Sequence, residues 1–478
     1  MHIVDISIIA AFLVATLYIG FTSGKKIKTF SDYAIGNRKF SDFAIYCTVA
    51  ATAIGGNATI GGIGKAYGVG IIQFLAQVGL PISFIIVATF LARRFSHYYG
   101  CCSLGDMFYK AYGTTGKVVA GIVGCTYETF ITGIQFIAMG TAISVLTKLS
   151  YNVSLLVSAG IILIYTGRGG IRAVTFTDVL QFMVLILAIP ILLMLVLGKI
   201  GGVSVLFERL PESYVSFQGE NFNRYLFLML PLMLPTLSPH HVQRLLMTSS
   251  YKQGIKAYYN LSWIYLMIAI ITIFLGLSAK LLFPELPKAD QALFVLITNY
   301  LPVGVLGIAV IGVLAVLMSS ADSDLNSGSI MLVNDVIIPY NKYIKKKDLS
   351  EPEKLKYTRM ISLLMGIGAI VFASQKVGIF ETRILIRTMW FSIILSPLYF
   401  LLFNMKISLK GLLLSITAGL GTFILWNLNI KPITKIDGLF PGFFANVITV
   451  LFFYFLGGQQ KVFSKEELEL KRLAEMQA

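Results

Sequence analysis

The sequence has 478 residues, of which 56% are hydrophobic and only 13% are charged. Soluble domains carry about 25% charged residues because they must cover their surface for water, so a soluble globular enzyme is not expected. The formal net charge of +16 does not indicate a nucleic-acid partner, because the meaning of a basic excess in such an apolar chain depends on where the charges lie.

Apolar runs long enough to cross about 30 Å of hydrocarbon recur along nearly the whole chain. We therefore predict a single all-α polytopic domain, residues 1–478, embedded in a lipid bilayer. The first run has no basic segment before it and opens a series of runs, so we interpret it as a retained helix rather than a cleaved signal. About thirteen segments are predicted: 3–22, 41–66, 71–92, 118–147, 152–166, 174–198, 225–243, 257–283, 302–340, 360–375, 384–403, 408–428 and 439–456.

Lysine and arginine are distributed unevenly between alternate loops of this topology. The loops after odd-numbered segments, together with the C-terminal tail, hold 27 of them, whereas the loops after even-numbered segments hold 11. Because basic residues accumulate on the cytoplasmic side, we predict that the N-terminus lies outside and the C-terminus in the cytoplasm. We expect the membrane to be a bacterial inner membrane.

Two segments contain helix-breaking residues within apolar sequence. Segment 41–66 carries Gly55, Gly56 and Asn57, and segment 225–243 carries three prolines. Glycine frees the backbone and proline removes an amide donor, so each segment is predicted to break and to expose unpaired peptide groups, which a membrane tolerates only beside a cavity. Alternatively, these residues only mark close packing and kinks.

The two interrupted segments are five apart in the series, so they enter the membrane from opposite faces. Segments 118–147 and 302–340, both unusually long, stand in the same relation. Matching interrupted helices in oppositely oriented halves indicate an inverted-repeat secondary transporter with a site near the membrane midplane. We expect core repeats at about 41–199 and 223–403, with peripheral helices at about 3–22, 408–428 and 439–457.

Segment 302–340 carries a stripe of polar side chains. Ser319, Asp322, Ser323 and Asn326 recur at the spacing of one helix face. Hydroxyl, carboxylate and broken-helix carbonyl oxygens are the ligands that a small hard cation prefers, and the stripe has no His or Cys to favour a transition metal. The alternative is a hydrogen-bonded seam between helices, which is less favourable because acidic side chains in a bilayer are costly.

Three motifs make the sequence similar to a known family. Residues 165–181, YTGRGGIRAVTFTDVLQ, resemble the Gly-Gly-x-x-Ala-Val-x-x-Thr-Asp-x-x-Gln signature of the sodium/solute symporter family. Residues 319–326, SSADSDLN, resemble its second signature, and residues 242–244, VQR, resemble a third and weaker one. The similarity covers roughly residues 32–455.

The resemblance implies a non-enzymatic transporter with a five-plus-five inverted-repeat (LeuT-like) fold and sodium as the coupling ion. Carried over residue by residue, the sodium ligands of the family fall on five positions of this chain. They are the carbonyl oxygens of Ala51, Ile54 and Val316 and the hydroxyls of Ser319 and Ser320.

The resemblance also suggests a second sodium site. Asp178 matches the Thr-Asp acid of the first signature, and in members similar to the sialic acid transporters that acid joins groups that correspond here to Asp322 and Ser323. Alternatively, Asp178 forms a structural ion pair with Arg168 or Arg172.

The expected solute-binding positions depart from better-known members. Proline permeases have an acid where this chain has Ala53, and sugar transporters have a Glu-Gln pair where it has Asn57 and Ala58. Gln77 matches a polar sugar-binding position, and His240 falls near an aromatic gating position, although a purely structural role for this His is the alternative. Neither proline nor galactose can therefore be carried over as the solute.

Further polar residues bear on the solute. Glu128 and Gln135 belong to a polar stripe on segment 118–147, and Arg387 lies near the start of segment 384–403. Arginine is suited to bidentate recognition of a carboxylate, so a cavity-facing Arg387 favours an amino acid or organic anion. The alternative is an internal ion pair between Arg387 and Glu128 or another acid.

We therefore expect a sodium-coupled symporter that imports a small polar organic solute by alternating access and functions as a monomer. A solute sensor of the same fold is a rival, although it normally needs an attached output domain and only a short tail follows Leu456. A sodium-leak channel and a proton-coupled transporter are further alternatives.

Overall fold

The computed structural model describes residues 2–25, 27–218, 222–375, 379–434, 438–464, 466–469 and 471. Within these ranges the regular elements are helices, and 10 helical stretches are long and apolar enough to cross a membrane. This confirms the all-α membrane class predicted from the sequence. The number of crossings, thirteen, stays a prediction.

The α-helices follow one another along the chain without an intervening strand in the described ranges. They are α1 (Ile3–Gly24), α2 (Phe30–Ile35), α3 (Asp42–Ala53), α4 (Gly62–Val69), α5 (Gln73–Ile86), α6 (Leu104–Thr147), α7 (Tyr151–Ile200), α8 (Val203–Arg209), α9 (Glu212–Val215), α10 (Phe222–Met233), α11 (Pro239–Leu246), α12 (Tyr251–Leu282), α13 (Ala292–Tyr300), α14 (Val305–Met331), α15 (Ile338–Tyr343), α16 (Glu351–Ser374), α17 (Ile379–Trp390), α18 (Ser396–Leu402), α19 (Leu409–Leu425), α20 (Lys431–Thr434) and α21 (Leu439–Leu456).

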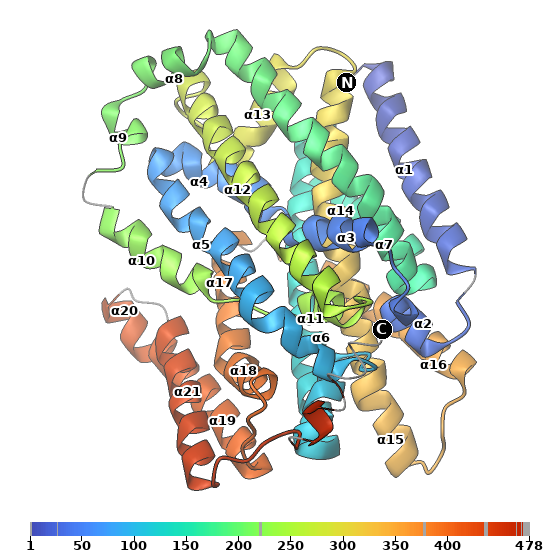
Figure 1. Ribbon diagram of the computed structural model, residues 1–478. Coiled ribbons are helices and arrows are strands. Elements are labelled where there is room, and N and C mark those ends of the chain that lie inside the picture. Colours follow the sequence, from blue (N-terminus) through green and yellow to red (C-terminus); the bar gives the residue numbers. More distant parts are fainter. Residues whose placement is uncertain are drawn as a thin grey trace.

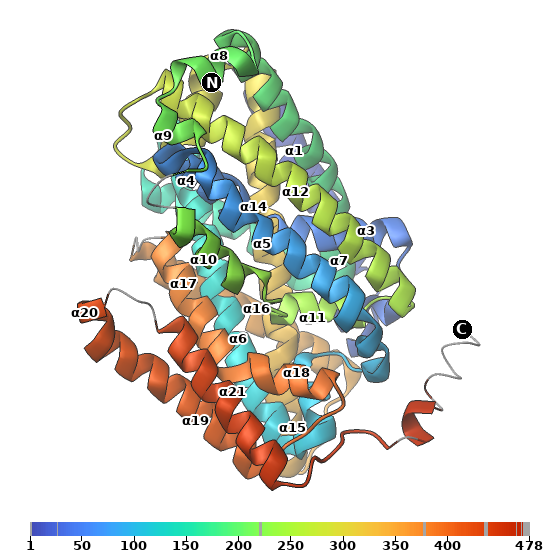
Figure 2. The same cartoon turned by 60° about the vertical axis from the view of Figure 1, so that its left-hand side comes forward.

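Helix α14 is the centre around which the other helices pack (Figures 1 and 2). Every residue from Ala309 to Met331 is buried, and α6 and α7 flank the helix along its length. A helix that carries several polar side chains can be buried on all sides only if its neighbours supply hydrogen-bond partners. Helix α14 therefore positions the polar groups on which the functional site depends.

Both segments predicted to break are interrupted in the structure. Helix α3 ends at Ala53, Ile54 leaves the helical conformation with φ −91° and ψ 73°, and the chain becomes helical again from Asn57. The second segment forms α10 and α11, with a non-helical stretch between them that includes Leu237 at φ 42°. The prediction of two interrupted segments is therefore confirmed. The repeat boundaries stay a prediction.

Helix α7 is continuous along the chain but folds back on itself at Gly170. Gly170 has φ 49° and ψ −154°, a conformation open essentially to glycine alone. Tyr165 and Thr177 both hydrogen-bond Oδ2 of Asp322, at 2.8 and 3.4 Å. In a straight helix these residues would be about 18 Å apart along the axis, so α7 comprises the two predicted segments 152–166 and 174–198.

The last helices lie at the edge of the molecule. In both views α19 and α21 run side by side away from α14, and they pack against the region of α17 and α18 (Figures 1 and 2). Only three residues of α21 are buried, namely Gly442, Asn446 and Val450. These two helices correspond to the predicted segments 408–428 and 439–457, whose peripheral role stays a prediction.

We predict that Gly170→Ala lowers the stability of the protein. The positive φ alone costs about 1–3 kcal/mol for a residue with a Cβ atom, and the new Cβ would lie 2.7 Å from the ring of Tyr33 and 2.8 Å from its carbonyl oxygen. Thermal unfolding of the purified protein in detergent measures the effect. Gly160→Ala in the same helix, with nothing within 4 Å of its Cβ position, is the control, and equal melting temperatures for the two variants would contradict the prediction.

Candidate functional site

The end of α3 and the middle of α14 meet through oxygen atoms. Ser319 Oγ donates to the carbonyl oxygen of Ala51 at 3.0 Å and lies 3.1 Å from the carbonyl oxygen of Val316. Ser320 Oγ lies 3.4 Å from the carbonyl oxygens of both Thr52 and Val316. Hard cations bind oxygen ligands that surround the ion at about 2.3–2.6 Å, and oxygen atoms 3.0–3.4 Å apart suit such a cluster.

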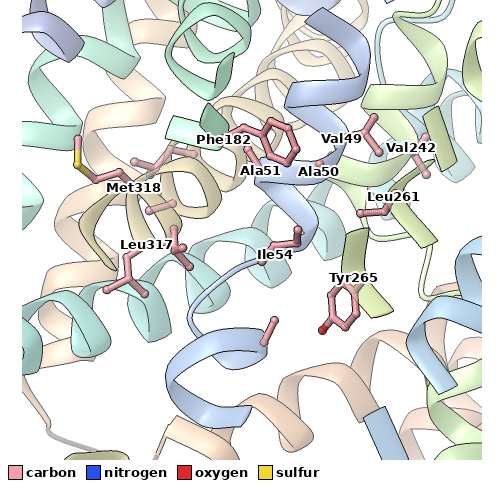
Figure 3. Close-up of a cluster of buried hydrophobic side chains, with 14 of the residues drawn as sticks. Val49, Ala50, Ala51, Ile54, Phe182, Val242, Leu261, Tyr265, Leu317 and Met318 are labelled. Atoms are coloured by element: carbon pink, nitrogen blue, oxygen red, sulfur yellow. The ribbon is translucent and has the colours of Figure 1, made fainter. Parts of the chain in front are cut away.

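The break in α3 supplies these carbonyl groups. The last four carbonyl groups of a helix have no partner within it, and in α3 they belong to the residues from Ala51 to Ile54. Figure 3 shows the ribbon unwinding just after Ile54, beside the part of α14 that carries Leu317 and Met318. Gly55 leaves room for Ser320 here, because a Cβ on residue 55 would lie 2.7 Å from Ser320 Oγ and one of the two would have to move. The break in α3 therefore frees the carbonyl oxygens, and Ser319 and Ser320 of α14 bind them.

The acids expected at a second ion site are buried next to this arrangement. Asp322 accepts hydrogen bonds from Tyr165 and Thr177. Asp178 accepts one from Thr48 at 2.5 Å, and both acids are 0% exposed. These contacts join α7 to α14 and α3 to α7.

An arginine that sequence reasoning did not place lies between these groups. Arg244 on α11 is 1% exposed, and its Nη2 donates to Ser323 Oγ at 2.5 Å, to Thr52 Oγ1 at 3.2 Å and to Asp178 Oδ2 at 3.4 Å. Three oxygen atoms from α3, α7 and α14 thus surround one guanidinium nitrogen. The positive charge at this point of the structure is supplied by the protein itself.

The proposed ion pair of Asp178 with Arg168 or Arg172 is wrong. Arg172 pairs with Asp32 at 2.6 Å, and the guanidinium of Arg168 lies over the ring of Phe21. Gly170 turns the chain between Arg168 and Asp178, whereas Arg172 lies on the same part of α7 as Asp178 but about 9 Å away along the helix axis. The VQR motif was the signal in the sequence, because its arginine is the one that reaches Asp178.

A cavity of about 100 Å³ lies between the two broken segments. Three of the six predicted solute-binding residues line it, namely Asn57, His240 and Arg387. Other polar lining groups come from the break between α10 and α11, from α11 itself, from α17 and from other helices. They include Thr236, Ser238, His241 and Arg383.

The other three predicted solute-binding residues lie outside this cavity. Gln135 lines a second, smaller cavity of about 30 Å³, which also contains Asn57. Gln77 contacts Thr272 on α12, with Oε1 3.5 Å from the hydroxyl. Glu128 is 0% exposed and lies against His240. Asn57 is thus the residue that the two cavities share.

Arg387 enters the larger cavity without a carboxylate partner among the described residues. Its Nη2 donates to the carbonyl oxygen of Pro231 at 3.1 Å, its guanidinium stacks over Phe391, and its buried Nε has no hydrogen-bond partner. The alternative of an ion pair with Glu128 is wrong, because Glu128 is bound to His240. A guanidinium with an unused donor is a receptor for an anionic group.

The chain can now be compared with known proteins. Residues 33–419 match the model of the family described as "Sodium:solute symporter family". The chain belongs to this family. Sodium/proline symporter 2 of Staphylococcus saprophyticus is 26% identical to this symporter over 91% of this chain and 89% of that one. The sodium/pantothenate symporter of Haemophilus influenzae is 25% identical over 72% and 73% of the respective chains.

Two solved structures share the fold of this symporter. A Na⁺-coupled sialic acid symporter in a substrate-bound outward-open state has a TM-score of 0.79 at 18% identity and covers 97% of this chain and 100% of its own. A nucleobase-cation-symport-1 family transporter in a closed conformation has a TM-score of 0.60 at 14% identity, covering 92% and 98%. The protein is thus a sodium-coupled symporter of a small organic solute rather than an enzyme.

We predict that Asp178→Asn destabilises this symporter by about 3–5 kcal/mol, the range for removing one partner of a buried ion pair. The substitution leaves the Arg244 guanidinium without its carboxylate 3.4 Å away. In thermal unfolding, the double variant Asp178→Asn/Arg244→Gln should lose clearly less stability than the sum of the two single variants. Additive losses would contradict a direct interaction between the two side chains.

Proposed function

We propose that this symporter imports a small polar solute that carries a carboxylate, an amino acid or an organic anion, together with sodium. The proposal is supported by the short distance between a cluster of oxygen atoms and the cavity. Oxygen atoms of α3 and α14 converge beside a cavity that contains Arg387, which has no acidic partner in the part of the chain that the structure describes. The ion and the solute would therefore bind next to each other, on opposite sides of the break in segment 41–66.

The proposed sodium ligands are the carbonyl oxygens of Ala51, Ile54 and Val316 and the hydroxyls of Ser319 and Ser320. The contacts between Ser319 and Ala51, and between the two serines and Val316, support four of these five positions. Ile54 is the residue at which α3 stops, so its carbonyl is not committed to the helix. Sodium bound there would hold the broken end of α3 against α14.

Asp178, Asp322 and Ser323 remain the proposed second sodium site. Arg244 donates to both Asp178 and Ser323, so a second ion requires this guanidinium to move away from them. Two cations repel each other at such short range. Either a second sodium or the Arg244 guanidinium would therefore lie beside Asp178 and Ser323, but not both at once. This arrangement favours transport with one firmly held sodium.

In the proposed solute site, Arg387 binds the carboxylate of the solute, and Asn57 and His240 offer further polar contacts. Gln135 would act from the smaller cavity through its proximity to Asn57. Gln77 and Glu128 would act indirectly, through Thr272 and His240 respectively. A charged hydrogen bond contributes about 1.5–3 kcal/mol, which makes Arg387 the largest single contributor.

Transport would proceed by alternating access in a bacterial inner membrane, with the N-terminus outside and the C-terminus inside. The two repeats, 41–199 and 223–403, would move relative to each other within one chain, so a monomer suffices. Each sodium that moves inward through about 100 mV releases roughly 2.3 kcal/mol. That energy, added to the sodium concentration gradient, drives accumulation of the solute.

We predict that Ser319→Ala combined with Ser320→Ala abolishes the sodium dependence of uptake. The double change removes both hydroxyl ligands while leaving the helix intact. Uptake into proteoliposomes, with choline replacing sodium, is the measurement. Ser329→Ala, also buried on α14, is the matched control and should retain sodium dependence. Sodium-dependent uptake by the double variant would contradict the proposed site, and uptake driven by a proton gradient alone would favour the proton-coupled alternative.

We predict that Arg387→Gln weakens binding of carboxylate solutes about tenfold or more, because one charged hydrogen bond is lost. A thermal-shift screen of amino acids, carboxylates and sugars, with and without sodium, first identifies the ligand class. Arg387→Lys keeps the charge but loses the planar donor pair, so it should restore only part of the affinity. An equal loss for carboxylates and neutral sugars would show that Arg387 does not select the anion.

A further inference from the structure

Three side chains from three different helices converge beside the cavity. His240 Nδ1 on α11 lies 3.0 Å from Oε1 and 3.2 Å from Oε2 of Glu128 on α6, and 3.0 Å from Oδ1 of Asp324 on α14. One ligand atom from each residue falls within 4.8 Å of the other two, and all three residues are buried. We call Glu128, His240 and Asp324 the triad.

Hydrogen bonds around the triad orient its imidazole. His240 Nε2 lies 2.9 Å from Ser238 Oγ, which itself lies 2.6 Å from Nδ1 of His241. The backbone N–H of His240 donates to Glu128 Oε1 at 3.0 Å and holds that carboxylate in place. A metal-binding histidine commonly coordinates through one ring nitrogen while the other is hydrogen-bonded. Nδ1 of His240 is therefore the nitrogen aimed at the two acids.

The triad contains an excess of negative groups and an unused ligand atom. Asp324 Oδ2 is buried and has no hydrogen-bond partner. Among the described residues, the only ion-pair partner of Glu128 or Asp324 is His240. Two ionised carboxylates and one protonated imidazole leave a net charge of −1 at this buried position, which a bound cation would neutralise.

We propose that the triad is a binding site for a divalent transition-metal ion such as Zn²⁺. A neutral imidazole and two carboxylates balance a 2+ charge, and the mixed nitrogen and oxygen ligands favour Zn²⁺ or Co²⁺ over Mg²⁺ and Ca²⁺. Ligand atoms about 2.0–2.1 Å from a tetrahedral ion lie roughly 3.3 Å from one another. The 3.0 Å separations in the triad need to increase by only a few tenths of an ångström.

Metal binding at the triad would restrain the transport cycle. The ion would tie α11, half of a broken segment, to the long helices α6 and α14. His240 also lines the cavity, so the ion would sit at the wall of the proposed solute site. Micromolar Zn²⁺ is therefore expected to slow solute uptake by the unmodified protein.

The decisive experiment titrates Zn²⁺ by calorimetry into the purified, chelator-treated full-length symporter in detergent. One ion per chain is expected, with Mg²⁺ unable to compete. Glu128→Gln and Asp324→Asn should each weaken the affinity at least tenfold while retaining all four histidines of the chain, which separates the triad from adventitious histidine sites. Absence of saturable binding, competition by Mg²⁺, or unchanged affinity in both variants would overturn the proposal.

Two controls protect the result against misfolded variants and stray ligands. His97→Gln removes an imidazole that belongs neither to the triad nor to the hydrogen bonds that orient it, and this variant should bind Zn²⁺ with nearly unchanged affinity. In the unmodified protein, bound Co²⁺ should give the absorption spectrum of a site with nitrogen and oxygen ligands. Thiolate-to-cobalt bands would assign the ion to one of the four cysteines instead, and would also overturn the proposal.

Discussion

The contact between the broken end of α3 and the serines of α14 is the interaction on which the structure depends. Peptide carbonyls left without helical partners cannot face lipid, so another part of the protein must bind them. Ser319 and Ser320 do so for Ala51 and Thr52. The same oxygen atoms can surround a cation. The requirement to satisfy the backbone in a membrane thus creates the group of oxygen atoms that we propose as sodium ligands.

Buried charges extend this arrangement across the molecule. Asp178 and Arg244 join α7 to α11, and His240 joins α11 to acids on α6 and α14. In each case the partners come from different helices, so the charges can be balanced only while those helices stay together. Helix α11 carries Arg244 and His240, which are the basic partners in these two contacts. The position of α11 relative to α14 therefore depends on the charges of the buried acids Asp178, Glu128 and Asp324.

Thr52 connects the proposed sodium site to the Asp178 and Arg244 pair. Its carbonyl oxygen is 3.4 Å from Ser320, while its hydroxyl contacts Ser323 and Arg244. An ion that moved the end of α3 would shift both sets of contacts together. Through Thr52, binding of the proposed sodium ion would thus affect how α11 packs against α3. Helix α11 forms one wall of the cavity.

The sequence alone determined the membrane class, the two interrupted segments and the polar stripe of α14, because apolar length, helix-breaking residues and helical spacing are local properties. Only the tertiary structure decided which groups meet. It brought Arg244 rather than Arg172 to Asp178, because α11 packs against α3 and α14 while Arg172 pairs with Asp32. It also placed His240 beside Asp324, although the stripe itself contains no histidine. Contacts between side chains on different helices depend on how the helices pack, and no local pattern records that packing.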